Sequence, residues 1–301
     1  MKSDILLESG TGEVEVLEFI VNNKNYAINV IKVKEVVDID NLTKLPNCHP
    51  SIEGVILCRN EIITLIDLGY ILDGTRKQSS KFKTIICEFN KIKVAFKIDD
   101  VVAIHRIKWE QIQKPDEIST NNLVIGNIIL NNKIILLLDF EKIVTDINPS
   151  TGISEDRIVN VAYKNRDNVK IVLADDSALI RRLLKDTLTK AGFKNLIFFD
   201  DGKQTLEYLK GLSQEKGENF IEDVQILITD IEMPQMDGHT LIRQVKEDPT
   251  LRQLPCIIFS SLITDNLKHK GISVGANGQL SKPEIGQLVD MVDDFMEKSK
   301  I

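Results

Sequence analysis

Three aspartates, a serine and a lysine in the second half of the chain each lie at the end of a short apolar run. They are Asp175 and Asp176 after residues 170–174, Asp230 after residues 224–229, Ser260 after residues 256–259, and Lys282 after residues 279–281. Short apolar runs that alternate with helical patterns predict parallel strands, and ligands bind at the carboxyl ends of such strands. We therefore expect these five side chains to meet in one pocket.

The chemistry that suits this pocket is metal-assisted phosphoryl transfer. Two carboxylates about 4 Å apart repel by about 4 kcal/mol at an effective dielectric of about 20, and a divalent cation offsets that repulsion. Hard oxygen ligands suit Mg2+, and a carboxylate oxygen can then attack a phosphoryl group in line. Asp230 is the best candidate nucleophile because it stands alone at its strand end, which leaves Asp175 and Asp176 to hold the metal.

The remaining pocket residues would balance the charge of the phosphoryl oxygens. The Lys282 ammonium and the Ser260 hydroxyl can each compensate one oxygen. Pro283 favours an extended Lys282 ahead of the last helix. The tight loop of residues 233–238 can bring a backbone carbonyl, that of Glu232, towards the metal.

Two halves with different patterns must position these residues. The first half is dense in β-branched and aromatic runs separated by short polar turns, which predicts an all-β domain. From Lys170 onward, strand-like runs alternate with amphipathic helical stretches, which predicts an α/β doubly wound domain with a parallel sheet. We expect an N-terminal tail at residues 1–13, the β domain at 14–146, a polar linker at 147–168 and the α/β domain at 169–301.

The β half contains an internal repeat. Residues 54–67 match residues 126–139 without a gap, and each copy consists of a strand, a polar turn, a second strand and an acid before a short helix. Two similar units predict a pair of small β-barrels, because closure removes exposed sheet edges. Asn131 suits the turn of the second copy because Asn tolerates a positive φ. Arg59 occupies the equivalent position in the first copy, although Arg has no such preference for a turn. Arg59 is therefore either a solvated charge or a partner contact.

The bulk composition excludes several classes of protein. A formal net charge of -7 without a basic cluster argues against a nucleic-acid partner. No apolar run is long enough to span a bilayer and no signal peptide is visible, so we expect a cytoplasmic protein without direct membrane insertion. The four cysteines show no Cys-x-x-Cys pairing, which favours free, reduced thiols.

Both halves resemble known families. Residues 169–298 resemble a flavodoxin-like response-regulator receiver domain, on Leu-Ala-Asp-Asp-Ser, Thr-Asp-Ile-Glu-Met-Pro-Gln-Met-Asp-Gly, Ile-Phe-Ser-Ser and Ser-Lys-Pro. Residues 14–145 resemble the CheW coupling domain, on Tyr-Ala-Ile-Asn, Glu-Val-Val and Ile-Ile-Thr-Leu-Ile-Asp-Leu. This domain order is similar to that of the CheV chemotaxis coupling proteins.

The resemblance implies an adaptor that joins chemoreceptors to their kinase. It implies phosphorylation of Asp230 by the histidine kinase CheA and binding to the cytoplasmic tips of chemoreceptors, at receptor arrays on the inner face of the membrane. It further implies Mg2+ on Asp175, Asp176 and Asp230, with Ser260 and Lys282 as phosphate contacts.

The sequence departs from the family pattern at two positions. Gln279 stands where many receivers carry an aromatic residue that moves when the hydroxyl residue engages phosphate. Asn60 replaces the glycine of the family's usual Arg-Gly turn, whereas Arg59 is retained.

Two other functions remain open at this point. The chain could be a phosphate sink, in which the lifetime of the acyl phosphate matters more than docking, or a carboxylate-dependent phosphatase. The phosphatase is the weakest alternative because no Asp-x-Asp acid arrangement follows a strand, and we expect a signalling protein rather than an enzyme.

One segment has the sequence of an esterase nucleophile elbow, Gly271-Ile-Ser-Val-Gly275. An elbow must follow a strand, whereas this segment follows a predicted helix, so we do not expect an esterase.

Overall fold

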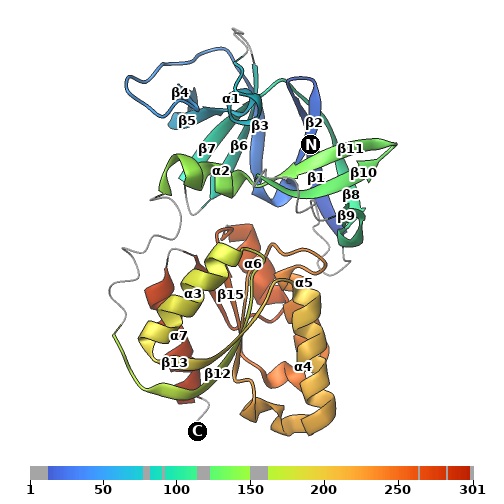
Figure 1. Cartoon of the computed structure of the whole chain (residues 1–301), viewed down its shortest axis with the longest axis vertical. Coiled ribbons are helices and arrows are strands. Elements are labelled where there is room, and N and C mark those ends of the chain that lie inside the picture. Colours follow the sequence, from blue (N-terminus) through green and yellow to red (C-terminus); the bar gives the residue numbers. More distant parts are fainter. Residues whose placement is uncertain are drawn as a thin grey trace. The chain divides into compact units, whose positions relative to one another are not determined.

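The computed structural model describes residues 13–76, 82–89, 92–113, 123–149, 162–263, 265–282 and 284–298. These residues form two compact units, one ending at residue 149 and the other beginning at residue 162 (Figure 1). The expected N-terminal tail, apart from Glu13, and residues 150–161 of the expected linker lie outside the described residues. No helix within the described ranges is long and apolar enough to cross a membrane.

The first unit is built mainly from strands. They are β1 (Glu13–Val21), β2 (Lys24–Asn29), β3 (Val33–Ile39), β4 (Ile52–Cys58), β5 (Glu61–Asp67), β6 (Phe82–Phe89), β7 (Ile92–Ile98), β8 (Asp100–Lys108), β9 (Ile112–Gln113), β10 (Val124–Leu130) and β11 (Lys133–Leu138), with the helices α1 (Leu68–Asp73) and α2 (Phe140–Ile147). One sheet has the order β8-β1-β2-β11-β10-β9 and the other the order β3-β6-β7-β5-β4. Each sheet has its own apolar core, around Ile128 in the first and Leu65 in the second. The prediction of an all-β domain built from two small units is confirmed.

The internal repeat appears as two equivalent hairpins. The β4–β5 hairpin and the β10–β11 hairpin have the same strand register about their two-residue turns. Asp67 and Asp139 cap the helices that follow, because each carboxylate accepts a backbone N–H bond from the third residue after it. The predicted sequence of strand, turn, strand and helix-opening acid is therefore correct in both copies.

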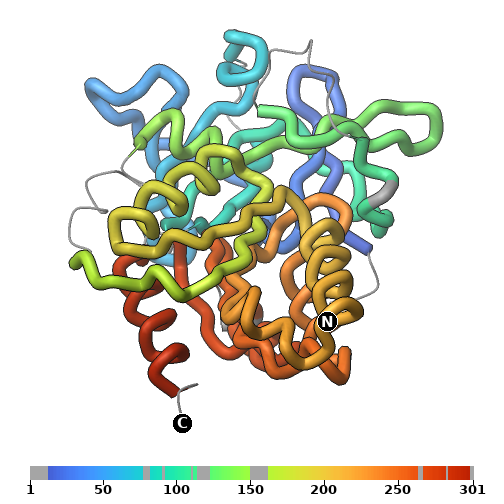
Figure 2. The backbone as a smooth tube through the Cα atoms, turned by 60° about the horizontal axis from the view of Figure 1, so that its bottom comes forward, coloured from blue at the N-terminus to red at the C-terminus, as the bar shows by residue number. Residues whose placement is uncertain are grey.

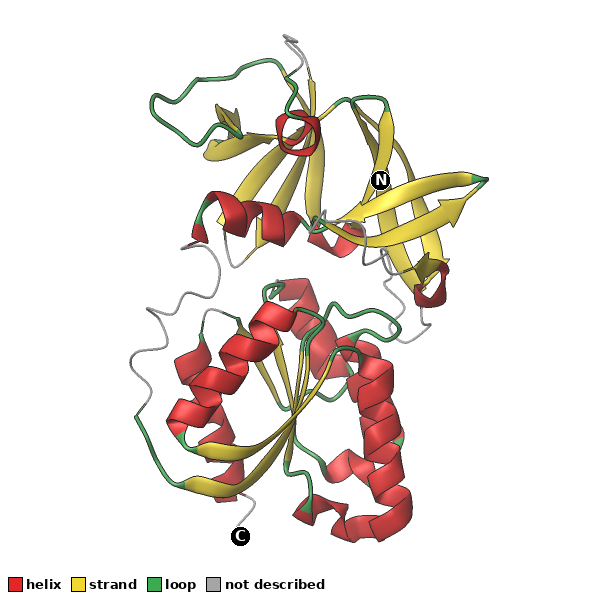
Figure 3. Cartoon of the chain, viewed as in Figure 1, coloured by secondary structure: helices red, strands yellow, loops and turns green. Residues whose placement is uncertain are grey.

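The second unit is an α/β layer structure (Figure 3). Its strands are β12 (Arg166–Ala174), β13 (Phe193–Phe199), β14 (Ile226–Thr229), β15 (Cys256–Ser260) and β16 (Gly278–Ser281), and its helices are α3 (Ala178–Ala191), α4 (Gly202–Lys216), α5 (Gly238–Glu247), α6 (Asp265–Ser273) and α7 (Ile285–Lys298). All strand pairs are parallel, in the order β13-β12-β14-β15-β16. The expected doubly wound fold is confirmed.

Side chains alternate between the two faces of this sheet, as strand geometry requires. Ile171, Ile226 and Ile257 pack under α3 and α7 in one core cluster. On the opposite face α4 and α5 lie side by side (Figure 2). Because helices cover both faces, polar side chains of the strand ends converge only at the edges of the sheet.

The polar segment before the sheet is part of the second unit. Residues 166–168 fall in the range expected as linker, but they form the start of β12. Arg166 explains this, because its guanidinium makes two bonds of 2.8 Å to the Asp293 carboxylate of α7 and lies over the Phe193 ring. Gly192 at the end of α3 has a φ of +103°, and the Lys164 carbonyl oxygen would lie 1.9 Å from any Cβ there.

This contact makes Gly192 a position where a side chain is not tolerated. Replacing Gly192 by Ala should lower the free energy of unfolding of the second unit by at least about 2 kcal/mol, from left-handed backbone strain and displacement of Lys164. Urea unfolding followed by circular dichroism measures this. Gly211 is the matched control, because it lies inside α4 and an added methyl group would have no other atom within 4 Å, and Gly211→Ala should stabilise by about 0.5–1 kcal/mol. Equal effects of the two substitutions would contradict the expectation.

Candidate functional site

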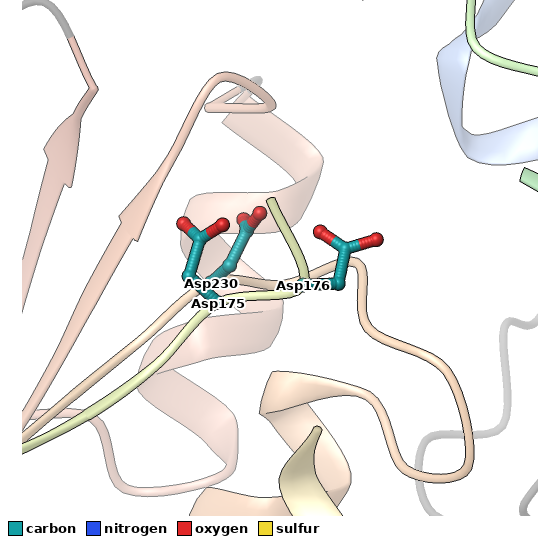
Figure 4. A group of neighbouring side chains, drawn as sticks. All are labelled: Asp175, Asp176 and Asp230. Carbon is teal, nitrogen blue, oxygen red and sulfur yellow. The ribbon is translucent and has the colours of Figure 1, made fainter. Parts of the chain in front are cut away.

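The carboxyl edge of the second unit's sheet brings the predicted acidic residues together (Figure 4). Asp175 and Asp176 follow β12 directly, and Asp230 follows β14, the strand paired with it. One carboxylate oxygen from each of the three lies within 4.8 Å of the others. Asp175 and Asp230 are buried, whereas Asp176 is exposed. The predicted convergence of three aspartates from two strands is therefore present in the structure.

Lys282 is the cation at the centre of this cluster. It follows β16, and its Nζ lies 2.5 Å from Oδ2 of Asp230 and 3.0 Å from Oδ2 of Asp175. All three side chains are more than nine-tenths buried. Buried charges without partners are costly, so the ammonium and the two carboxylates stabilise each other's ionised forms.

Hydrogen bonds to three neighbouring residues fix the position of Asp175. Its Oδ1 accepts the N–H of Ser177, its carbonyl accepts a bond of 2.6 Å from Nη1 of Arg181, and its own N–H donates to Phe199. Burial, helped by the nearby charge of Asp230, raises the pKa of Asp175 to about 6 even though Lys282 opposes the rise. A proton on this carboxyl therefore competes with any cation near neutral pH.

The donor set fits Mg2+. Its ligands are hard carboxylate oxygens, and their 4.8 Å spread is close to the roughly 4 Å between opposite ligands of an octahedral magnesium ion. The three carboxylates outnumber the one ammonium, so the cluster keeps a negative charge that a divalent cation would offset. Asp175, Asp176 and Asp230 would hold the ion, and the exposed Asp176 leaves a side open to water.

The loop after Asp230 is closed by backbone contacts. The Ile231 N–H donates to Oδ1 of Asp230 at 2.6 Å, and the Gly238 N–H donates to the Ile231 carbonyl at 2.9 Å. A Cβ at Gly238 would meet the Asp230 carbonyl oxygen at 1.9 Å, so only glycine allows this closure. Glu232 lies inside the loop and is half-buried, and its carbonyl remains our candidate for a further metal ligand.

Ser260 ends β15, the strand between β14 and β16, and is 1% exposed. Its Oγ accepts the Leu262 N–H at 3.3 Å, and its carbonyl accepts the Lys282 N–H at 3.1 Å. The hydroxyl is thus engaged by its own loop, beside the strand that carries Asp230. Pro283, predicted to shape the turn after Lys282, lies outside the described residues.

Comparison with known proteins matches each unit to a described domain. Residues 15–148 match the CheW-like domain and residues 171–293 match the response regulator receiver domain. The chain is 31% identical to chemotaxis protein CheV3 of Helicobacter pylori, over 91% of this chain and 89% of that protein. It belongs to the CheV family of chemotaxis proteins. Chemotaxis protein CheV1 of the same organism is 27% identical, over 92% of this chain and 90% of its own length.

The individual domains also align with solved structures. The crystal structure of scaffolding protein TtCheW from Thermoanaerobacter tengcongensis aligns with 42% of this chain and 89% of that chain, at 28% identity and a TM-score of 0.40. CheV proteins join a CheW-like coupling domain to a receiver domain, and the two units of this chain have that order.

Arg59, the candidate partner residue of the coupling domain, lies in a strained turn. Its φ is 47° and that of Asn60 is 68°, the same left-handed pair as Asn131 and Asn132 in the second hairpin. Such a conformation costs a non-glycine residue about 1–2 kcal/mol. The Arg59 guanidinium lies 2.7 Å from Glu35, but its side chain is 80% exposed, so this ion pair offsets little of the strain.

An apolar patch beside Arg59 was not predicted from the sequence. Leu57 and Ile62 form a cross-strand pair on the first hairpin and are 66% and 76% exposed. Their equivalents on the second hairpin, Ile129 and Ile134, are also paired and are 51% and 64% exposed. The signal was available in the repeat, because these outward positions are aliphatic in both copies. The two pairs lie on different sheets, so we call only Leu57 and Ile62, the pair beside Arg59, the hairpin patch.

Gln279 makes contacts that no aromatic residue could make. Its Nε2 donates to the Lys268 carbonyl of α6 at 2.8 Å, while its buried Oε1 has no hydrogen-bond partner among the described residues. A buried acceptor without a partner costs about 1–3 kcal/mol. The Gln279 amide packs against Gly271. A Cβ at Gly271 would lie 2.5 Å from Oε1 of Gln279, so a larger residue at position 271 would displace the amide. In this CheV protein the residue at the usual aromatic position is bonded to α6.

The segment that spells an esterase elbow has the wrong context. Gly271-Ile-Ser-Val-Gly275 ends α6 and precedes β16, whereas an elbow joins a strand to a following helix. Ser273 donates to the Lys270 carbonyl of its own helix. The expected order of elements around this segment is confirmed.

The raised pKa of Asp175 predicts how metal binding depends on pH. Mg2+ must displace the Asp175 proton, so its affinity should fall about tenfold per pH unit below pH 6 and be nearly constant above pH 7. The stability of the metal-free protein should change in the opposite direction. Because the folded state holds this proton more tightly than the unfolded chain, stability rises as pH falls from 7 towards 4.

Calorimetric titration with MgCl2 between pH 5 and pH 8 measures the affinity. An Asp175→Asn variant serves as the control, since it should bind more weakly but with a flatter pH profile. A wild-type affinity that is constant down to pH 5 would show that Asp175 does not bind the metal.

Proposed function

We propose that this CheV protein is an adaptor that couples chemoreceptors to the histidine kinase CheA and is regulated by phosphorylation of Asp230. The observation that carries the proposal is the Lys282 ammonium held between Asp175 and Asp230 at the carboxyl edge of a receiver sheet. The CheW-like domain on the same chain supports the coupling role. No second catalytic domain is needed for this function, so we propose a signalling protein rather than an enzyme.

The transfer step follows from the positions of the pocket residues. A carboxylate oxygen of Asp230 forms a bond to phosphorus while the bond from phosphorus to the donor histidine nitrogen breaks, and the electron pair stays on nitrogen. Asp175, Asp176, Asp230 and the Glu232 carbonyl would hold Mg2+, which would supply positive charge to neutralise the phosphoryl oxygens. Water later forms a bond to the phosphorus while the bond from phosphorus to the Asp230 oxygen breaks, which regenerates the carboxylate and releases inorganic phosphate.

Lys282 and Ser260 take new partners in the phosphorylated state. Asp230 loses its carboxylate charge, so the Lys282 ammonium exchanges this partner for a phosphoryl oxygen. The Ser260 Oγ accepts the Leu262 N–H, which leaves the hydroxyl proton available to donate to a second phosphoryl oxygen. An acyl phosphate carries a charge of about −2, enough to reposition the loops that hold these residues.

The coupling domain offers a surface for protein partners. The hairpin patch exposes two paired aliphatic side chains, and exposed apolar groups on neighbouring strands can mark an interaction site. Arg59 lies in the turn beside Leu57 and supplies a charge to the same surface. We propose that chemoreceptor tips and CheA bind the coupling domain, with Arg59 as one contact.

Phosphorylation of Asp230 should change the affinity of the coupling domain for these partners. Purified CheA should label the wild-type chain, and Asp230→Asn should abolish labelling because the nucleophile is lost. Asp186→Asn, an exposed position on α3, is the matched control and should be labelled normally. Pull-down of receptor fragments and CheA, with and without acetyl phosphate, then measures the effect on binding.

The alternative function gives a different result in the same experiment. Normal labelling with identical partner binding before and after phosphorylation would favour a phosphate sink over a regulated adaptor. Absence of labelling on wild-type protein would contradict both functions.

Arg59→Asn separates partner binding from fold stability. Asn suits the left-handed turn, so relief of strain should offset the lost Glu35 pair and leave the unfolding free energy within about 1 kcal/mol of wild type. Affinity for a receptor fragment or CheA should fall at least about fivefold, as expected for a charged contact worth about 1 kcal/mol. Arg106→Asn is the control, because Arg106 also pairs with a glutamate, Glu15, and is about half exposed. Unchanged affinities for both partners would show that Arg59 is a solvated turn charge.

A further inference from the structure

A buried histidine in the receiver domain has no role in the transfer chemistry. His239 lies in the first turn of α5 and is 1% exposed, and the backbone of Leu267 on α6 is its hydrogen-bonding neighbour. Burial of an imidazole excludes the water that would solvate its charged form, so its protonation depends on what covers it. Its ring faces α6, where the backbone of Leu267 lies close to it.

The charges around His239 disfavour a second positive charge. Lys270 of α6 and Arg243 of α5 oppose protonation, whereas Asp237, the cap of α5, favours it. Burial is the largest effect and lowers the pKa of His239 from 6.5 to about 4. Burial also lowers the pKa of Lys270. With α6 in its present position, the imidazole is therefore neutral at physiological pH.

Helix α6 is weakly held against the rest of the domain. Of its described side chains, Leu267 is the only apolar one that is buried, and Ile272 is 66% exposed. The buried His239 ring lies on its α5 side, and Oε1 of Gln279, which has no hydrogen-bond partner among the described residues, lies where β16 meets it. Elements that contact few apolar groups are the first to move in a folded protein.

The pocket is connected to α6 through a short segment. Ser260 ends β15, and α6 begins at Asp265. The bond from the Leu262 N–H to Oγ of Ser260 fixes the start of this segment. If the Ser260 side chain rotates towards a phosphoryl group, Oγ moves away from the Leu262 N–H, and this bond lies three residues before the first residue of α6.

We propose that phosphorylation of Asp230 moves α6 away from α5 and that His239 takes up a proton when this happens. The proposal rests on the proposed function, since it assumes that Asp230 is the phosphoacceptor. Displacement of α6 removes Lys270 and the covering backbone from the ring, so water can solvate the imidazolium. The phosphorylated conformation of this receiver is then coupled to proton concentration.

The direction of the coupling follows from linkage. The pKa of His239 rises on switching, from about 4 towards 6.5, so the switched state binds more protons and is favoured as pH falls. Between pH 7.5 and pH 6 the equilibrium between the two conformations should shift about fourfold towards the switched state. The effect fades above this window because there His239 is neutral in both conformations.

Nuclear magnetic resonance of the full chain tests this with histidine labelled at its ring carbon. The chain has four histidines, and substitution of each assigns its signal. Beryllofluoride with Mg2+ serves as the phosphoryl stand-in, and the fluorine signal of the bound adduct shows that Asp230 is occupied. Between pH 5.5 and 7.5 the His239 signal should be constant without the adduct and should titrate with a midpoint near 6.5 when it is bound.

The outcomes separate this inference from the proposed function. A bound adduct with a His239 signal that still does not titrate would overturn the inference and leave the proposed function intact. Failure of the adduct to form, with no phosphorylation of Asp230 by CheA, would remove the proposed function instead. Because this measurement uses the wild-type side chains, it does not depend on the folding of any variant.

A pair of variants provides a second measurement. His239→Leu should abolish the roughly fourfold part of the pH dependence of beryllofluoride affinity that lies between pH 7.5 and 6. His269→Leu is the matched control, because His269 lies on α6 next to Lys270 but is exposed, and its pH profile should equal that of wild type. Identical profiles for wild type and His239→Leu would overturn the inference.

Discussion

The buried contact of one ammonium with two carboxylates organises the receiver domain. Lys282, Asp175 and Asp230 come from three different strands, and none of their charges would be stable in this position alone. The parallel strand order brings the three strand ends to one edge, and backbone bonds from Ser177 and Ile231 fix the remaining carboxylate oxygens. The same groups that stabilise the charged cluster are the ones that phosphoryl transfer requires.

This arrangement explains why small loops around the pocket are so constrained. Gly238 must lack a side chain because the Asp230 carbonyl occupies its space, and the Ser260 hydroxyl is bonded within its own loop. When Lys282 exchanges the Asp230 carboxylate for a phosphoryl oxygen, the loops around Asp230 therefore have little room to adjust. The chain leads from Ser260 to α6, where Leu267 is the only buried apolar side chain among the described ones and where Oε1 of Gln279 has no hydrogen-bond partner among the described residues.

The coupling domain follows a different constraint, that of an internal duplication. The repeat makes the two hairpins equivalent in register and turn geometry, so differences between the copies stand out. Arg59 occupies a left-handed position that Asn fills in the other copy. The left-handed conformation is unfavourable for Arg, so the stability of the fold does not explain why Arg stands at this position, and a role in function is the better explanation.

The elements, the repeat, the family resemblance and the types of residue in the pocket could all be predicted from the order of the amino acids. Strand ends followed by Asp, Ser and Lys are local features, and the parallel order of βα repeats brings such ends to one edge. The start of β12 was not predictable, because the polar residues 166–168 have the pattern of a linker, and only the bond from Arg166 to Asp293, 127 residues away, makes them part of the sheet. The contact of Gln279 with α6 and the burial of His239 were hidden for the same reason. Burial and pairing depend on which distant segments share a surface, and only the tertiary structure decides that.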